Sequence, residues 1–125
     1  MNTRLPKNKT AYQGCLFCRI VKGEIPAQKI FENKELLAFR DINPQAPIHI
    51  IIIPKKHIAS LSGAEEKDNA LLGRLQLAIS EIAEKLVGKN GGYRIVTNRG
   101  EDAGQSVFHL HYHLLAGRIF TWPPG

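Results

Sequence analysis

The sequence predicts a single α+β domain: an antiparallel five-stranded sheet with one long helix and a short N-terminal helix. Five short segments rich in β-branched and aromatic residues are separated by turn residues, whereas only one stretch keeps helical periodicity over several turns. The segments come in the order three strands, long helix, two strands, which favours antiparallel pairing over a doubly wound parallel sheet. A chain of 125 residues is long enough for one hydrophobic core and too short for two.

The first half of the chain supplies the short helix and three strands. Residues 1–13 predict a flexible basic arm because they offer little to bury, and we expect one domain over 14–125, including the terminal Trp-Pro-Pro-Gly tail. Residues 15–23 predict a short helical turn that ends at a glycine. Strands are expected at 28–32, 36–41 and 48–54. The third is a nearly continuous β-branched run, which is typical of a central buried strand.

The second half supplies the long helix and two strands. Ser62-Gly63-Ala64-Glu65 has the spacing of a capping box, so the helix is expected to begin between Ala64 and Asp68 and to end at Gly88. Its buried stripe is predicted to consist of Leu71, Leu75, Ala78, Ile79, Ile82 and Leu86. A strand at 93–97 and a glycine-bearing loop at 98–104 lead into a last strand, expected to run to about residue 118.

Charge and composition argue against nucleic-acid and membrane partners. The net charge of +6 arises in residues 1–60, which hold ten Lys/Arg against four Asp/Glu, because residues 61–125 hold seven of each. No aromatic residues interleave with the basic ones, so we expect no nucleic-acid partner. The longest apolar run is too short to cross a bilayer, and we expect no membrane association. Two cysteines do not make a disulfide framework, and we expect a reducing, cytoplasmic location.

Three alternating histidines are the most informative feature. In a strand, residues two apart share a face, so His109, His111 and His113 are predicted to stand in a row. Leu110, Tyr112 and Leu114 are then expected to face the core. The alternative is a half-exposed strand that carries histidines by chance, but a row of imidazoles is poor packing material.

Such a row suits attack on phosphorus, because histidine is one of the nucleophiles of covalent catalysis. The site also needs donors around the phosphate and a proton source for the leaving group. Gln105, Ser106, His113 and the amides of the loop that ends at Gly104 are candidates. The sequence contains neither a GxxxxGK[ST] phosphate loop nor a tight acidic cluster that suggests magnesium.

Two further features each leave two interpretations open. His49 interrupts a buried strand and is either a satisfied core residue or part of a polar relay. Asp41 ends a strand and is either a turn former or a carboxylate that accepts hydrogen bonds from a ribose diol; its local sequence favours the turn.

The CxxC pair, Cys15 and Cys18, is likewise either one half of a zinc site or two small buried hydrophobes. A redox role needs a thioredoxin-like βαβ pattern around the pair, which this sequence lacks.

The run Gln-Ser-Val-Phe-His-Leu-His-Tyr-His-Leu-Leu at 105–115 resembles the signature of the histidine-triad (HIT) superfamily. The segments 39–47 and 53–57 and the terminal Trp-Pro-Pro-Gly are similar to the Hint branch, the purine nucleoside phosphoramidases, rather than to the Fhit-like dinucleoside polyphosphate hydrolases. The transferase branch has Gln where this chain has His113. The resemblance covers nearly the whole chain from Cys15 onward.

The resemblance implies a nucleotide-binding hydrolase that cleaves the P–N bond of purine nucleoside 5′-phosphoramidates through a nucleotidyl-histidine intermediate on His111. The catalytic set that it implies is His111, His113, His109, His49, Ser106 and Gln105. The nucleotide contacts that it implies are Asp41, Asn98, Phe17, Ile20, Phe39, Ile42, Gly104, Gln105, Ser106, Val107, His111, His113 and Trp122. In such proteins the Trp reaches the partner's site, so a two-fold homodimer with a continuous sheet is expected.

The resemblance also implies that no cofactor is required for catalysis, while many bacterial relatives hold structural zinc. The zinc ligands would be Cys15, Cys18, His57 and His109. Zinc ligation competes with a catalytic role for His109, since a ligated nitrogen cannot relay protons. Three other classes remain: a nucleotide-binding scaffold with incidental hydrolysis, a zinc protein whose histidines serve metal, and a nucleic-acid binder.

Overall fold

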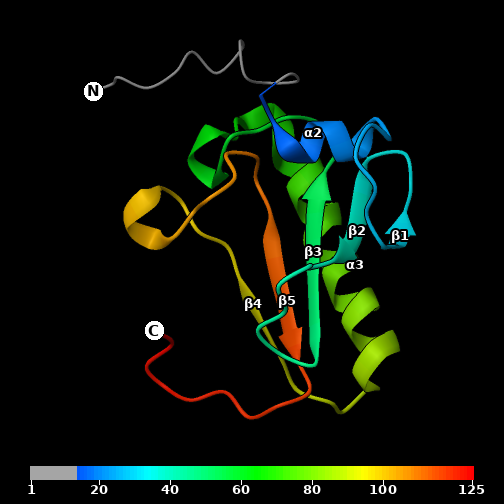
Figure 1. The fold of residues 1–125 in the computed structure, drawn as a ribbon, viewed down its shortest axis with the longest axis vertical. Coiled ribbons are helices and arrows are strands. Elements are labelled where there is room, and N and C mark those ends of the chain that lie inside the picture. The colour runs from blue at the N-terminus through cyan, green and yellow to red at the C-terminus, as the bar shows by residue number, and fades with distance from the viewer. Residues whose placement is uncertain (1–13) are drawn as a thin grey trace.

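The sheet is antiparallel and five-stranded, as predicted. The structure is a computed structural model that describes residues 14–125, so the expected arm at 1–13 lies outside the described residues. The strands are β1 (Lys29–Glu32), β2 (Leu36–Arg40), β3 (Ile48–Pro54), β4 (Tyr93–Val96) and β5 (Tyr112–Ala116). Their order in the sheet is β1-β2-β3-β5-β4, and every neighbouring pair is antiparallel (Figure 1).

Two helices pack on the sheet, and each closes a separate apolar core. The long helix α3 (Asn69–Val87) lies along one face of the sheet (Figure 1) and packs there against β3 and β5. The short helix α2 (Leu16–Val21) buries Phe17 and Ile20 in the other core, together with side chains of β2 and β3. Strand β3 contributes to both cores, which explains its nearly continuous apolar sequence.

The start of the long helix differs from the prediction. Ser62 lies in a 3₁₀ turn, η1 (Leu61–Gly63), and a second turn, η2 (Glu66–Asp68), precedes the helix, so the expected capping box is wrong. The carboxylate of Asp68 instead accepts the backbone N–H of Glu65 at 2.9 Å. Asp68 also pairs with the ammonium of Lys56, and this pair ties the helix start to the loop that follows β3.

The end and the stripe of α3 follow the sequence more closely. Gly88 caps the helix with a φ of 82°, a conformation that a glycine adopts without strain. Leu75, Ile79 and Ile82 are buried as predicted, but Leu86, in the last turn, is 36% exposed. In the described part of the chain, no helix combines the length and the apolar character that crossing a membrane requires.

The histidine segment is only partly a strand, which corrects the prediction of a strand from 105 to about 118. Strand β5 begins at Tyr112, opposite Ile52, and ends at Ala116. Before it, the N–H of Leu110 donates to the carbonyl of Ile58 at 2.6 Å, in the loop beyond β3. The alternation of faces survives, because Leu110, Tyr112 and Leu114 all lie in the core on the α3 side.

Candidate active site and metal-ligand cluster

His111 presents one free ring nitrogen. Its Nδ1 lies 2.7 Å from the carbonyl oxygen of His109, which can only accept, so Nδ1 carries the proton and Nε2 carries the lone pair. The ring is 6% exposed, and the ring of Phe17 stands edge-on to it at 5.1 Å. Burial lowers the pKa of His111, an effect opposed by the hydrogen bond to the His109 carbonyl. His111 is therefore a neutral imidazole with its lone pair on Nε2, the form in which histidine is a nucleophile.

A chain of hydrogen bonds sets the proton positions on the two neighbouring histidines. The backbone N–H of Gln45 donates to Nδ1 of His49 at 3.0 Å, so the proton of neutral His49 is on Nε2. That Nε2 lies 2.9 Å from Nδ1 of His113 and 3.3 Å from Oδ2 of Asp41. His49 thus donates to His113, whose own proton must be on Nε2. His113 is left with a donor at its outer nitrogen.

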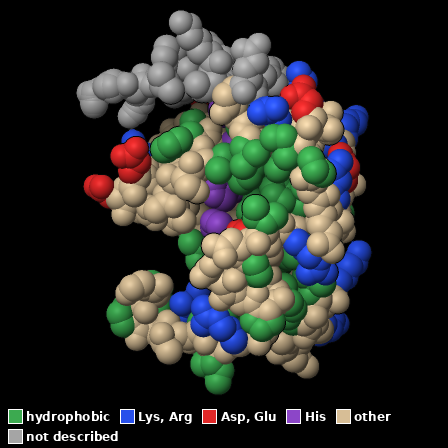
Figure 2. All heavy atoms as spheres, viewed as in Figure 1, with side chains coloured by type: hydrophobic (Ala, Val, Ile, Leu, Met, Phe, Trp, Pro, Cys, Tyr) green, Lys and Arg blue, Asp and Glu red, His purple; other side chains and the backbone are tan. Residues whose placement is uncertain are grey.

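Both of these rings stay uncharged near neutrality. Burial lowers the pKa of His49, while the carboxylate of Asp41 acts in the opposite direction. Burial, together with the neighbouring rings of His111 and His49, lowers the pKa of His113 to about 4. The ring centroids of His111 and His113 are 5.1 Å apart. Figure 2 shows histidine side chains at the bottom of a hollow in the molecular surface.

Asp41 forms the turn that its local sequence favours and also faces the histidine site, while its contact with a ribose diol stays a prediction. Its Oδ1 accepts the backbone N–H of Asn43 at 2.7 Å, which is the turn-forming bond expected from the local sequence. Its Oδ2 faces Nε2 of His49. The carboxylate therefore shapes the loop after β2 and also adds a negative charge to the histidine site.

The four predicted metal ligands, His109 among them, come together in a second cluster. Their donor atoms, on Cys15, Cys18, His57 and His109, all lie within 4.8 Å of one another. Nδ1 of His109 is 3.4 Å from Sγ of Cys15 and 3.5 Å from Sγ of Cys18, and Nδ1 of His57 is 3.3 Å from Sγ of Cys18. A tetrahedral zinc with ordinary Zn–S and Zn–N bonds requires S···N edges of about 3.5 Å. The geometry fits.

The protonation of this cluster also fits a metal. Nε2 of His109 lies 2.8 Å from the carbonyl oxygen of Pro54, so the proton is on Nε2 and the lone pair of Nδ1 points at the thiols. Burial, followed by Cys15, raises the pKa of the Cys18 thiol to about 12. Without a cation the Cys18 thiol stays protonated, which opposes the redox interpretation. Asp41, His49 and His113 form another group of possible ligands, but the proton on Nε2 of His49 suits a relay rather than a metal.

The loop before the histidines is held by Gln105. Its Oε1 accepts the N–H of Gly100 at 2.8 Å, and its Nε2 donates to the carbonyls of Ala59 at 2.8 Å and Val107 at 3.2 Å. Gln105 is buried, whereas Ser106 and Gly104 are exposed and Asn98 is half-buried. The structure thus shows Gln105 ordering the loop, and its contact with phosphate stays a prediction.

The aromatic and isoleucine side chains among the predicted nucleotide contacts divide into two groups. Phe17 and Phe39 meet edge-to-face at 5.5 Å between ring centroids, and Ile20 lies in the same buried cluster. Ile42 is 98% exposed and Trp122 is 81% exposed, so the fold of one chain does not enclose them with the others.

Thr97 is a site residue that the sequence analysis missed. Its hydroxyl donates to the carbonyl of His111 at 2.8 Å, just before β5 begins. The antiparallel pairing of the strands at 93–97 and 112–116 was a usable signal, because it brings Thr97 opposite the start of the histidine strand. The N–H of Gln45 and the carbonyl of Pro54 bond to His49 and His109 through the backbone. The types of these two residues therefore did not predict the bonds.

The alternating histidines, held at the start of a central strand in an antiparallel α+β sheet, define a domain of the histidine-triad class. The family model described as HIT domain matches residues 22–119. An uncharacterized HIT-like protein of Synechocystis sp. is 50% identical over 110 residues, which cover 88% of this chain and 96% of that protein. The chain belongs to the HIT domain family.

Solved structures agree in fold and in extent. A HIT family hydrolase from Legionella pneumophila has a TM-score of 0.86 and 50% identity, over 89% of this chain and 99% of its own. A histidine triad protein from Clostridium difficile has a TM-score of 0.83 and 42% identity, over 87% and 95%. Family, fold and site together support a nucleotide-binding hydrolase of the HIT type.

Proposed function

We propose that this protein hydrolyses the P–N bond of purine nucleoside 5′-phosphoramidates of the AMP–amine type, through a nucleotidyl group on His111. The observation that carries the proposal is the hydrogen bond from Nδ1 of His111 to the carbonyl of His109, because it leaves Nε2 free and unprotonated. A buried neutral imidazole held in one tautomer needs no separate base before it attacks phosphorus.

The reaction proceeds in two displacements. Nε2 of His111 forms a bond to the α-phosphorus as the P–N bond to the amine breaks, and the amine leaves with a proton supplied from the site. Water then attacks phosphorus and gives a proton to the group that protonated the amine, while the bond to Nε2 breaks. The nucleoside monophosphate is released, and His111 and the proton donor are both restored. The donor on Nε2 of His113, in β5, is suited to the phosphate oxygens. Ser106, which is exposed in the loop before the histidines, is suited to the leaving group.

The nucleotide is oriented by groups around this centre. We assign the ribose to Asp41, the base to Phe17, Phe39 and Ile20, and the phosphate surroundings to the loop from Asn98 to Val107. Phe17 supports the base assignment because it also contacts the ring of His111, so that pocket and nucleophile share a wall.

We also propose that the Cys15, Cys18, His57 and His109 cluster holds a structural zinc ion. The S···N distances and the orientation of His109 support it. Bonds from the two thiolates and two imidazoles to zinc would join α2, the loop after β3 and the histidine segment. His109 is then a ligand and a backbone acceptor for His111 rather than a proton carrier. Two free thiols also suit a reducing compartment such as the cytoplasm.

A homodimer is proposed through β4. Strand β4 is last in the sheet order, so within the described residues one of its edges lacks a strand partner. Ile95 pairs with Leu114, whose side chain is buried on the α3 side, so Ile95 lies on that face, where it is 39% exposed. Ile95→Lys is expected to give monomers in sedimentation experiments, whereas Leu61→Lys, at an exposed leucine in η1, leaves the dimer intact.

Steady-state hydrolysis of an adenosine 5′-phosphoramidate that carries a fluorescent amine tests the proposed reaction. His111→Ala is expected to lose several orders of magnitude in kcat while still binding AMP. Tyr112→Phe is the matched control, because Tyr112 follows His111 in the chain but its side chain lies in the core on the α3 side. A nucleotidyl adduct on wild type, detected by mass spectrometry after acid-free quenching, identifies the intermediate. If wild type and His111→Ala bind AMP equally and neither turns over, the protein is a nucleotide-binding scaffold.

A further inference from the structure

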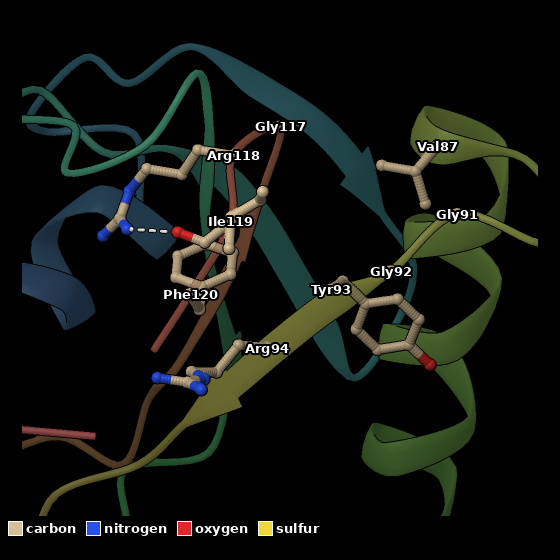
Figure 3. Close-up of a pocket in the computed structure, with 9 residues that line it drawn as sticks. All are labelled: Val87, Gly91, Gly92, Tyr93, Arg94, Gly117, Arg118, Ile119 and Phe120. Atoms are coloured by element: carbon tan, nitrogen blue, oxygen red, sulfur yellow. Dashed lines mark hydrogen bonds between the residues drawn. The ribbon is translucent and has the colours of Figure 1, made fainter. Parts of the chain in front are cut away.

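The chain that leaves β5 docks on the loop between β2 and β3. Gly117 has a φ of 93°, and a Cβ added there would lie 2.9 Å from Cβ of Pro47, so only a glycine permits this approach. The next residue, Arg118, donates from Nε to the carbonyl oxygen of Gln45 at 3.1 Å. Figure 3 shows Gly117, Arg118 and Phe120 in succession beyond β5, with Arg94 of β4 nearby.

Gln45 connects this junction to the histidine site. Its carbonyl receives Arg118, and its N–H donates to Nδ1 of the buried His49. The Nε2 of His49 donates in turn to His113. Three successive hydrogen bonds thus connect Arg118, whose side chain lies on the protein surface, to His113 of the proposed active site.

We propose that Arg118 is a positioning residue for the reaction: by holding Gln45 it keeps the proton of His49 on Nε2, and thereby keeps a donor on Nε2 of His113. The inference rests on the proposed function, in which that donor contacts the phosphate. Arg118 itself touches neither the nucleotide nor the reacting atoms.

Within the loop, the N–H of Asn43 donates to Asp41 and Nε2 of Gln45 donates to the carbonyl of Asn43. Neither bond holds the carbonyl of Gln45, which accepts from Arg118. Residues 42–45 are exposed, so solvent competes for their backbone groups. In the unliganded site, Asp41 also favours a proton on Nε2 of His49, at 3.3 Å. When a ribose diol engages the Asp41 carboxylate, the N–H of Gln45 becomes the main group that selects the tautomer. The effect of Arg118 should therefore be largest with nucleotide bound.

Arg94 provides a matched control. The guanidinium carbon of Arg118 lies 4.2 Å from the ring centroid of Phe120, and that of Arg94 lies 5.2 Å from the same centroid. Arg94 donates to the carbonyl of Thr121, in the tail itself, at 3.0 Å. Arg118 likewise donates from Nη1 to a tail carbonyl, that of Ile119, at 3.1 Å. Arg94→Met therefore removes a stacked guanidinium and a bond to the tail, as Arg118→Met does, but leaves the partner of Gln45 in place.

Long-range ¹H–¹⁵N spectra of the histidine rings, recorded on full-length protein with and without AMP, test the proposal directly. Wild type and Arg94→Met are expected to show His49 and His113 as single Nε2–H tautomers. Arg118→Met is expected to show a mixture of tautomers at both rings, most clearly with AMP. In hydrolysis assays, Arg118→Met should lower kcat about fivefold with KM within about twofold, as the loss of one hydrogen bond of ordinary strength implies.

Two results would overturn the inference: unchanged tautomers in Arg118→Met, or equal changes in Arg94→Met. Circular dichroism and thermal unfolding establish that both variants are folded, which is expected because both side chains contact solvent. If wild type shows no turnover, the proposed function fails, but the spectra still decide whether Arg118 sets the tautomers.

Discussion

Replacing Thr97 by Val tests how firmly the nucleophile must be held. Thr97 and Val have nearly the same shape, so the change removes one donor without opening a cavity. The lost bond is the 2.8 Å hydrogen bond to the carbonyl of His111, which lies just before β5. A second bond, 2.7 Å long, joins the ring of His111 to the carbonyl of His109. Loss of the Thr97 bond therefore frees the backbone of the residue whose ring must stay fixed.

The magnitude follows from the environment of that carbonyl. Leaving a buried acceptor without a partner costs about 1–3 kcal/mol, and because Thr97 is only half-buried we expect about 1.5 kcal/mol. With a urea m-value of about 1.5 kcal/mol/M for a small domain, the midpoint should fall by about 1 M. If the same energy is lost in positioning the transition state, kcat should fall about tenfold.

Urea unfolding followed by fluorescence, and hydrolysis of the fluorescent phosphoramidate, measure the two effects. Thr97→Ser keeps the hydroxyl and loses only a methyl group, so its kcat should stay within about twofold of wild type. The reasoning is refuted if Thr97→Val unfolds at the wild-type urea concentration, or if Thr97→Ser loses as much activity as Thr97→Val.

Three further predictions concern pH, metal and the core. His113 has a folded pKa of about 4, below its unfolded value of about 6.5, so the stability from its neutral ring is complete above pH 6.5 and is lost as pH falls toward 4; urea unfolding at pH 7.5 and 5 should show a smaller loss in His113→Asn. Treatment with a zinc chelator should lower the melting temperature and leave most of the activity of the folded fraction, and a protein purified without metal and indifferent to chelator would contradict the zinc proposal. Leu75→Ala, in the core beneath α3, should cost about 3 kcal/mol of unfolding free energy, whereas Leu77→Ala, at a side chain that is 68% exposed, should change it by less than about 0.5 kcal/mol.

Sequence periodicity was sufficient to predict the sheet and to predict which side chains of the histidine segment face the core. A continuous apolar run is buried only in a strand that is covered on both faces, and apolar side chains at helical spacing are buried along one stripe of a helix. The burial of β3 and of most of the α3 stripe therefore followed from residue type. The histidines follow the same rule, because Leu110, Tyr112 and Leu114 must enter the core and the histidines must then face away from it.

The tertiary structure decided which ring nitrogen carries the proton in His49, His109, His111 and His113. His109 and His111 donate to backbone carbonyls, and His49 accepts from a backbone N–H, so their tautomers depend on chain groups that every residue possesses. A backbone group also marks the start of α3, where the N–H of Glu65 donates to the carboxylate of Asp68, and not to a serine at the expected spacing. Residue type fixes which side chains can be buried together. The direction of each hydrogen bond depends on backbone groups that only the folded chain brings within reach.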